Sequence, residues 1–348
     1  MLVLYYEFEI KDDNSIYIIG ATKMTNDLLG IHHVTAITSS AEKNYQFYSG
    51  ILGMRLVKKT VNQDDIHTYH TFFADDEGNA GTDLTFFDFP GVPSGYYGTN
   101  SISRIGLRVP NDEALVYYEE RLKSFDIQTE EIQKVYDKKV LRFEDFDGQR
   151  LQIFSDENNK GVPAGKPWKN GPVPTDKAIY GLGPIEISVS YFEDFGKILE
   201  EIYGMKKIAD DGKQALFEVG DGGNGGQVIL RKDLVTPPGL QGYGEVHHVS
   251  FRVADHDAIQ HWVNKYQQIG LPSSGLVDRF FFEALYARIG DILIEISTDG
   301  PGFMGDEPYE TLGESLSLPP FLEEERAHIE SQIRHFDTTQ PNDYGFKS

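Results

Sequence analysis

Hydrophobic and polar residues follow one recurring order four times along the chain. Each repeat opens with a run of alternating apolar and polar residues, typical of a half-buried strand, and these runs start at residues 31, 102, 184 and 246. A stretch with apolar residues three to four apart follows and predicts an amphipathic helix, at 41–51, 113–124, 192–203 and 255–269. Each repeat ends in a mostly apolar strand, at 82–89, 150–154, 227–231 and 291–297. The pattern predicts four βαβββ units and an α+β fold.

A Pro- and Gly-rich stretch at 161–174 separates the second unit from the third and is the best candidate for a domain boundary. We therefore expect an N-terminal domain at 26–155, a linker at 156–180, a C-terminal domain at 181–302, and a tail at 303–348 with one helix at 320–334. Residues 1–23 precede the first unit, and Met24 leads directly into it. Our hypothesis is that translation naturally begins at Met24, which would make 1–23 a peripheral extension.

Two of the four units open with a histidine pair, His32–His33 and His247–His248, and the last strand of the fourth unit carries Glu295 among apolar residues. Two imidazoles and a carboxylate are a ligand set for a mononuclear metal with open coordination positions. A single strand histidine is more often structural, but pairs at matching positions of two repeats favour a metal site. A buried carboxylate also needs a cationic partner, and the alternative to a metal is a salt bridge from Glu295 to Arg279.

Strand geometry separates the members of each pair, because neighbouring side chains on a strand point to opposite faces. We expect His33 to share a face with Thr35, and His248 to share one with the serine two residues on. Each candidate ligand then lies beside a hydroxyl. His32 and His247 would reach the site only from its rim or from a neighbouring unit.

The second and third units serve as an internal control. Alignment of their openings places Arg104 and Glu186 at the positions of the two candidate histidines, and alignment of the last strands places Arg231 at the position of Glu295. Only units one and four keep the candidate ligands, so we expect these two units to pair across one cavity. Units two and three would form a second cavity, in which Glu186 binds Arg104 or Arg231 instead of a metal.

The composition narrows the range of partners. The chain has 55 Asp and Glu against 32 Lys and Arg, a formal net charge of −23, which disfavours nucleic acid and anionic membrane surfaces. It contains no cysteine, so disulfides, thiolate metal sites and cysteine nucleophiles are excluded. No apolar stretch reaches the length of a membrane span, and the first residues do not resemble a secretory signal. We expect a cytoplasmic protein, and a homo-oligomer stays open as an alternative to a monomer.

Several motifs resemble those of one enzyme family. The segment FYSGILGMRL at 47–56 resembles the signature of the vicinal oxygen chelate superfamily, which includes glyoxalases and extradiol dioxygenases. The segments GIHHVTAI at 30–37, GTDLTFFDFPG at 81–91 and IEISTDGPGF at 294–303 are similar to the ring-cleaving dioxygenases that act on hydroquinones. The resemblance covers roughly residues 26–335 and implies two glyoxalase/extradiol-dioxygenase-like domains.

The resemblance also implies roles for individual residues. Fe(II), or Mn(II) as a second choice for such ligands, would be bound by His33, His248 and Glu295. Supporting roles around the metal fall to five further residues: His32, Thr35, His247, Arg279 and Tyr286. Among these, His247 is the candidate for proton transfer, because an ordinary imidazole titrates near neutral pH. Arg279 and Tyr286 are candidates for stabilising substrate oxygens by hydrogen bonds.

The function predicted in this way is an Fe(II)-dependent, extradiol-type ring-cleaving dioxygenase that opens a hydroquinone or catechol with O2. Its partners would be a small aromatic substrate and O2. Two alternatives stay open: a glyoxalase-type metal-dependent isomerase or lyase, and a non-catalytic binding protein of the same superfamily. The isomerase generally needs a fourth protein ligand, and unit one offers only Thr85, Phe86 and Phe87 there. Nearby, His67 is expected to face solvent, and His70 is a weaker candidate for the cavity.

Overall fold

Four βαβββ units make up most of the computed structural model, which describes residues 4–10, 16–23 and 27–339. The first unit consists of β3 (Ile31–Ile37), α1 (Ala41–Asn44), the π-helix η1 (Tyr45–Ile51), β4 (Arg55–Asn62), β5 (Asp65–Ala74) and β6 (Asp83–Phe87). The second consists of β7 (Ser101–Val109), α2 (Asp112–Ser124), β8 (Gln133–Val135), β9 (Lys138–Glu144) and β10 (Arg150–Ser155). These elements confirm the predicted order of strand, helix and three strands.

The third and fourth units repeat the same order. The third consists of β11 (Leu182–Val189), α3 (Phe192–Glu201), β12 (Lys206–Asp210), β13 (Gln214–Glu218), the short 3-10 helix η2 (Asn224–Gly226) and β14 (Gln227–Lys232). The fourth consists of β15 (Val246–Val253), α4 (His256–Ile269), β16 (Ser273–Asp278), β17 (Phe282–Ile289) and β18 (Ile292–Pro301). The predicted α+β class is therefore confirmed.

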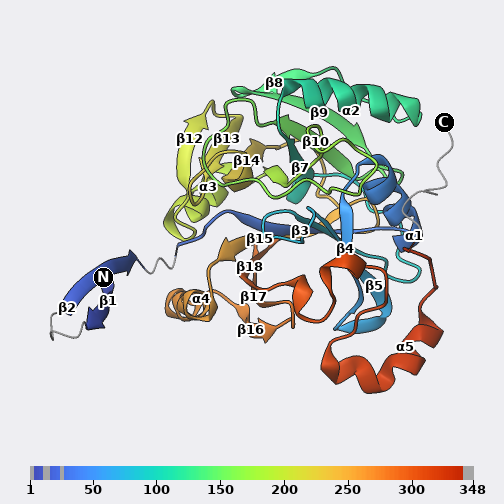
Figure 1. Cartoon of the computed structure of the whole chain (residues 1–348). Coiled ribbons are helices and arrows are strands. Elements are labelled where there is room, and N and C mark those ends of the chain that lie inside the picture. Colours follow the sequence, from blue (N-terminus) through green and yellow to red (C-terminus); the bar gives the residue numbers. More distant parts are fainter. Residues whose placement is uncertain (1–3, 11–15, 24–26, 340–348) are drawn as a thin grey trace.

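The strands form two large sheets of eight strands each, which lie one above the other in Figure 1. One sheet has the order β12-β13-β14-β11-β7-β10-β9-β8 and combines units two and three. The other has the order β16-β17-β18-β15-β3-β6-β5-β4 and combines units one and four. The prediction that units one and four pair with each other is confirmed. The domain boundaries stay a prediction, because each large sheet takes strands from both halves of the chain.

Helices join units that lie in different sheets: unit one to unit two, and unit three to unit four. Tyr118 on α2 is fully buried and donates a 2.7 Å hydrogen bond to the carbonyl of Leu52, just after η1. Tyr266 on α4 donates a 3.0 Å hydrogen bond to the hydroxyl of Tyr203, just after α3. Units one and two thus meet through helices, as do units three and four. The strand pairing and the helix packing together hold all four units in one body with a continuous apolar core.

The tail after β18 packs along β4, the edge strand of the sheet of units one and four. Lys58 and Lys59 on β4 are both buried; Lys58 forms a 2.8 Å ion pair with Asp306, and Lys59 donates a 2.8 Å hydrogen bond to Thr338. The tail contains η3 (Phe303–Gly305), η4 (Tyr309–Thr311), η5 (Pro320–Glu325) and α5 (Arg326–Gln332). The predicted helix at 320–334 is therefore wrong in part: its first six residues form a 3-10 helix, a common lead-in to an α-helix.

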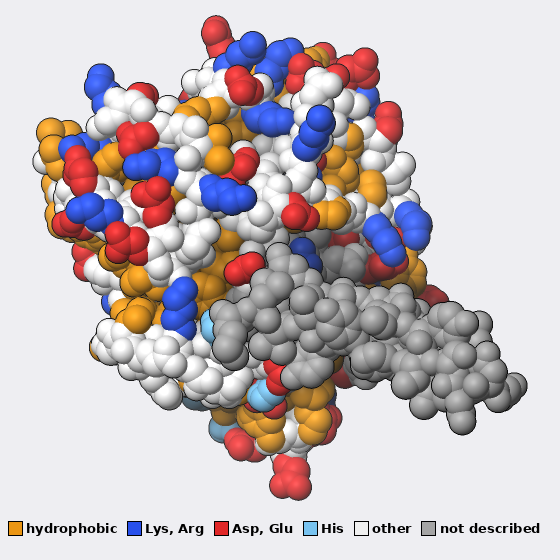
Figure 2. Space-filling view, turned by 90° about the vertical axis from the view of Figure 1, so that its left-hand side faces the viewer, with side chains coloured by type: hydrophobic (Ala, Val, Ile, Leu, Met, Phe, Trp, Pro, Cys, Tyr) orange, Lys and Arg blue, Asp and Glu red, His pale blue; other side chains and the backbone are white. Residues whose placement is uncertain are grey.

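The N-terminal strands β1 (Leu4–Ile10) and β2 (Ile16–Lys23) pair only with each other among the described strands (Figure 1). Met24, the start proposed from the sequence, lies outside the described residues. In the part of the chain that the structure describes, no helix is long and apolar enough to cross a membrane. On the face shown in Figure 2, acidic and basic side chains are interspersed and no large basic patch is visible.

Candidate metal centre

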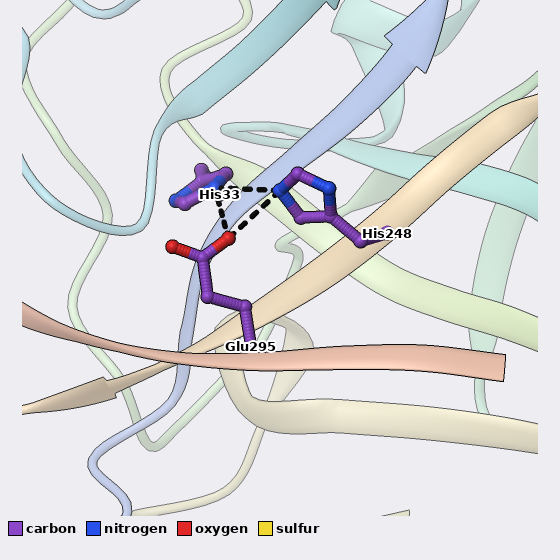
Figure 3. A group of neighbouring side chains, drawn as sticks. All are labelled: His33, His248 and Glu295. Atoms are coloured by element: carbon purple, nitrogen blue, oxygen red, sulfur yellow. Dashed lines mark hydrogen bonds and ion pairs between the residues drawn. The ribbon is translucent and has the colours of Figure 1, made fainter. Parts of the chain in front are cut away.

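Three neighbouring strands bring His33, His248 and Glu295 together (Figure 3). His33 lies on β3, His248 on β15 and Glu295 on β18, and these strands are adjacent in one sheet. The two Nε2 atoms are 3.2 Å apart, and Glu295 Oε2 lies 3.1 Å from His33 Nε2 and 2.8 Å from His248 Nε2. All three side chains are buried. The ligand set predicted from the sequence is thus assembled at one point.

This geometry fits a divalent metal ion. Ligand atoms that lie about 2.1 Å from a shared ion and at right angles to one another are about 3.0 Å apart, close to all three distances observed here. The buried Oε2 atom of Glu295 has no hydrogen-bond partner among the described residues, although two imidazole nitrogens approach it. Its Oε1 atom is satisfied, because the Ser297 hydroxyl donates a 2.7 Å hydrogen bond to it. The carboxylate therefore has one oxygen held by the protein and one free for a cation.

The protonation states of the triad also suit a metal. Burial alone would raise the pKa of Glu295, but the two imidazoles outweigh it and hold the pKa well below its ordinary range. Burial lowers the pKa of His248, and the nearby Glu295 only partly offsets this effect. The favoured forms are an ionised carboxylate and a neutral imidazole, which are the forms that bind metal ions.

The partner histidines occupy β-bulges. Between β3 and β15, Ser250 pairs with His33 and Phe251 with Ile31, so His32 is the extra residue on β3. On β15, Val246 pairs with Ala36 and His248 with Thr35, so His247 is the extra residue there. A bulge breaks the alternation of a strand and turns a side chain to a new direction. The expectation that His32 and His247 approach from the rim or from another unit is wrong, because each instead contacts the histidine that follows it.

Those contacts join Nδ1 to Nδ1, at 2.8 Å for His32 and His33 and at 2.7 Å for His247 and His248. Burial, with His33 nearby, lowers the pKa of His32 well below its ordinary value, so His32 is neutral. His32 Nε2 lies 3.1 Å from the carbonyl of Thr298, and a carbonyl only accepts, so Nε2 carries the hydrogen. His32 Nδ1 then accepts from His33 Nδ1, which leaves the lone pair of His33 on Nε2, the atom in the triad.

His247 differs from His32 in its surroundings. His247 lines the cavity beside His248, whereas His32 does not. No described residue is hydrogen-bonded to the Nε2 atom of His247. Burial, with a smaller contribution from His248, lowers its pKa to about 3, so the ring is neutral rather than titrating near neutral pH as its sequence position suggested. When His248 Nδ1 donates to His247 Nδ1, the hydrogen of His247 lies on Nε2. His247 is then a hydrogen-bond donor at the cavity.

Tyr286 lies beside the triad, because it pairs with Glu295 across β17 and β18 and its ring centroid is 5.9 Å from that of His248; Arg279 lies next to it. Arg279 Nε donates a 3.2 Å hydrogen bond to the Tyr286 hydroxyl, and Arg279 Nη2 lies 2.9 Å from Asp64 Oδ2. The neighbouring Gln63 donates a 2.8 Å hydrogen bond to the carbonyl of Arg279. The β4–β5 turn of unit one therefore holds an arginine of unit four. Arg279 is paired with Asp64, and the alternative salt bridge from Glu295 to Arg279 is not formed.

Thr35 pairs with His248 across β3 and β15, but its hydroxyl is hydrogen-bonded to another residue and not to the triad. Its hydroxyl is 2.7 Å from that of Thr85, which in turn is 3.0 Å from His70 Nε2. Thr85, at the position where a fourth metal ligand was considered, is therefore engaged with Thr35 and His70. His67, three residues before His70, is exposed as predicted.

A cavity of about 340 Å³ opens beside His33 and His248. Its size is at the small end of ligand pockets and suits a single ring. Its walls are mainly aromatic: Phe72, Phe87, Phe89, Phe281, Phe282 and Tyr286. The rest of the lining consists of the polar residues of the β4–β5 turn, Leu293, and the polar residues His33, Thr60, His70, His247, His248, Ser274 and Arg279. Sequence analysis did not identify the roles of Asp64 and Gln63, because only the folded sheet brings this turn to Arg279.

The second sheet has no such ligand set in the part of the chain that the structure describes. Glu186 is buried and forms ion pairs with Arg231, at 3.3 Å, and with Arg142, at 3.5 Å. The prediction that Glu186 binds an arginine is confirmed for Arg231. Arg104 instead donates a 3.4 Å hydrogen bond to the carbonyl of Leu151.

Comparison with known proteins shows the family of this chain. The profile of the Glyoxalase/Bleomycin resistance protein/Dioxygenase superfamily matches residues 30–153. MhqA of Bacillus subtilis (strain 168), provisionally named a ring-cleaving dioxygenase, is 44% identical over 311 residues, which cover 88% of this chain and 98% of MhqA. The chain belongs to the ring-cleaving dioxygenase family of this superfamily.

Two further similarities support that assignment. A chlorohydroquinone/hydroquinone 1,2-dioxygenase of Sphingobium indicum is 30% identical over 305 residues, which cover 84% of this chain and 92% of that enzyme. The crystal structure of a provisionally named dioxygenase from Bacillus subtilis subsp. subtilis str. 168 superposes with a TM-score of 0.82 at 33% identity. That match covers 91% of this chain and 100% of the other. The family predicted from the sequence motifs is thereby confirmed.

Proposed function

We propose that this protein is an Fe(II)-dependent ring-cleaving dioxygenase that opens a single-ring hydroquinone or catechol with O2. The observation that carries the proposal is the buried triad beside an aromatic cavity, with one carboxylate oxygen lacking a hydrogen bond. The relatives named as ring-cleaving dioxygenases support the same chemistry. Mn(II) is the second choice, because the same ligands suit it.

In this proposal His33, His248 and Glu295 hold the metal on one face. Bound Fe(II) would supply open positions for a phenolate oxygen and for O2. The reaction breaks one ring carbon–carbon bond next to a hydroxyl-bearing carbon and adds both atoms of O2. One end of the opened chain becomes a carboxylic acid and the other a carbonyl group, so no further oxidant or reductant is needed.

The remaining residues bind the ring and manage charge and protons. The aromatic walls pack against a flat substrate and exclude water, which strengthens polar interactions inside the cavity. Arg279 and Tyr286 are placed to hydrogen bond an oxygen that gains negative charge. His247, neutral with its hydrogen on Nε2, is placed to donate that proton to an oxygen in the cavity. His32 acts indirectly, because it fixes the tautomer of His33.

The glyoxalase-type alternative is less well supported. Such enzymes generally use a fourth protein ligand, and in the described residues only three ligand atoms of suitable type gather at this site. A non-catalytic binding protein would have no need for the triad. Both alternatives predict no consumption of O2.

The test is anaerobic loading of the purified protein with Fe(II), followed by measurement of O2 uptake with hydroquinone, catechol and phenol. We expect stoichiometric uptake of O2 with a hydroquinone or a catechol, and a ring-opened product that contains both oxygen atoms of 18O2. If the iron-loaded protein took up no O2 with either hydroquinone or catechol, the proposal would be contradicted.

A further inference from the structure

His70 is a polar residue set in the aromatic wall of the cavity. It lies on β5, and its ring contacts those of Phe72 and Phe87, with centroid distances of 4.0 and 4.4 Å and tilts of 38° and 42°. All three residues line the cavity. Burial, with smaller contributions from His33 and His248, lowers the pKa of His70 well below its ordinary value, so the ring is neutral. A neutral imidazole offers one donor and one acceptor.

One of these two nitrogens is engaged by the protein and the other is not. His70 Nε2 lies 3.0 Å from the Thr85 hydroxyl, which is itself 2.7 Å from the Thr35 hydroxyl. This contact fixes the ring between the two phenylalanines. Among the described residues, none is hydrogen-bonded to His70 Nδ1. A ligand hydroxyl can satisfy Nδ1 in either tautomer, because a hydroxyl both donates and accepts.

Several other polar groups on this side of the lining are already occupied, but the buried hydroxyl of Thr60, which pairs with His70 across β4 and β5, has no partner among the described residues. Gln63 donates to the carbonyl of Arg279, and the Ser274 hydroxyl donates to the carbonyl of Gly275. The side-chain oxygen of Asn62 accepts from the backbone of Asp64. These groups lie at turns or strand ends, whereas His70 lies within β5 between two rings. A hydrogen bond made beside such apolar walls is stronger than one at a wet rim.

The position of His70 in the sheet sets it apart from the metal side of the cavity. The sheet order is β3-β6-β5, so β5 lies two strands, or about 10 Å, from the strand that carries His33. The two oxygens of a hydroquinone lie at opposite ends of the ring, whereas those of a catechol are neighbours. A hydroquinone bound to the metal through one oxygen directs the other away from it, towards the far wall. A catechol places both oxygens at the metal.

We propose that His70 is the specificity residue of this cavity: its Nδ1 hydrogen bonds the second hydroxyl of a hydroquinone, and so favours hydroquinones over catechols. This inference rests on the proposed function and names the substrate class within it. The rings of Phe72 and Phe87 confine the imidazole of His70, and the Thr85 contact holds its orientation.

The test uses binding rather than turnover. Wild type, His70→Phe and His70→Gln are loaded anaerobically with Fe(II), and hydroquinone, catechol and phenol are titrated in the absence of O2 while binding is followed by calorimetry. His67→Gln is the matched control, because His67 lies on the same strand but is exposed. Metal content is measured for each variant, so that a loss of iron is recognised directly.

Loss of one hydrogen bond predicts an affinity for hydroquinone about three- to tenfold lower in His70→Phe, with the affinities for catechol and phenol unchanged. His70→Gln, which keeps a polar group, is expected to recover part of the loss, and His67→Gln to match wild type. Equal weakening of all three ligands, or no change for hydroquinone, would overturn the role of His70 while leaving the proposed function intact. Failure of wild type to bind any phenol would overturn the proposed function itself.

Discussion

The two large sheets of this protein share one architecture and differ in one set of charges. Both join a unit from each half of the chain through an antiparallel pair of opening strands, β3 with β15 and β7 with β11. Both pairs contain register shifts around the same positions, so the bulges are retained in the sheet that has no triad. In that sheet the bulge position of His32 is taken by Ser103. Glu186 pairs with Arg104 as Ser250 pairs with His33, so Glu186 lies at the position of Ser250, and the alignment that placed it at His248 was wrong by two residues.

The difference shows how the same backbone accommodates a buried carboxylate in two ways. In the second sheet Glu186 is neutralised within the protein by Arg231 and Arg142. In the first sheet Glu295 faces the imidazoles of His33 and His248, and one of its oxygens lacks a hydrogen bond. The arrangement around Glu186 is complete without an ion, whereas the arrangement around Glu295 is completed by a cation. The fold alone therefore does not specify the site.

Removal of the Glu295 charge should have the largest effect. Glu295→Gln keeps the size of the side chain but replaces the anionic oxygen, and we expect iron affinity to fall by at least about 100-fold, with loss of O2 uptake. The measurement is metal content by atomic absorption after anaerobic loading and desalting. Full metal content and activity in this variant would show that Glu295 is not a ligand.

The matched control is Glu186→Gln in the second sheet. Metal content and O2 uptake should stay as in wild type, because Glu186 is paired with arginines rather than a metal. The free energy of unfolding should fall by about 1–3 kcal/mol, mainly because Arg142, which is largely buried, loses its counter-charge; Arg231 is more exposed and contributes less. A loss of iron in this variant would contradict the separation of roles between the sheets.

The next largest effect is expected at His32, the bulge residue behind His33. His32→Phe keeps a ring but removes the acceptor for His33 Nδ1, so the tautomer of His33 is no longer fixed. We expect iron affinity to fall by about 10- to 100-fold. His261→Gln, at an exposed histidine of α4, is the control and should leave iron affinity unchanged. Equal iron affinities in wild type and His32→Phe would show that His32 does not support metal binding by His33.

A smaller effect is expected at the turn that crosses from unit one to unit four. Asp64→Asn removes the charge that pairs with Arg279, and kcat/KM for the aromatic substrate should fall by about three- to tenfold with iron content unchanged. Asp299→Asn is a matched control, because Asp299 pairs with Arg252 at 2.7 Å and neither residue lines the cavity. Equal losses in the two variants would argue against a role for Asp64 in positioning Arg279.

The smallest effect concerns stability and pH at Asp145, which accepts a 2.9 Å hydrogen bond from Tyr48. Burial raises the pKa of Asp145 to about 7 in the folded protein. The folded state thus keeps a proton that the unfolded state loses above its ordinary carboxyl pKa of about 3.9. The contribution of protonated Asp145 to the free energy of unfolding is complete at acid pH. It is lost as the pH rises towards 7, by at most about 1.4 kcal/mol per pH unit.

Asp145→Asn should therefore flatten the fall of melting temperature between about pH 4 and pH 7, with iron content unaffected. Thermal unfolding followed by circular dichroism across this range is the measurement. A slope in the variant equal to that of wild type would show that Asp145 does not titrate as described.

The fold and the triad could be predicted because each depends on signals repeated along the chain. Alternating residues define the strands, and the resemblance to hydroquinone-cleaving dioxygenases implies His33, His248 and Glu295 as the ligands. The bulges at His32 and His247 could not be predicted, because they depend on the register between β3 and β15, strands more than 200 residues apart. The contact of Asp64 with Arg279 was missed for the same reason, since it requires the sheet to curl. The pKa of His247 likewise depends on burial that the sequence does not reveal.

The most direct test of the account is a crystal structure of the protein loaded anaerobically with Fe(II), with anomalous diffraction measured at the iron edge. We predict one iron peak per chain, bounded by Nε2 of His33, Nε2 of His248 and Oε2 of Glu295, and no peak beside Glu186. Absence of iron between the three ligands, or an iron peak in the second sheet, would contradict the account.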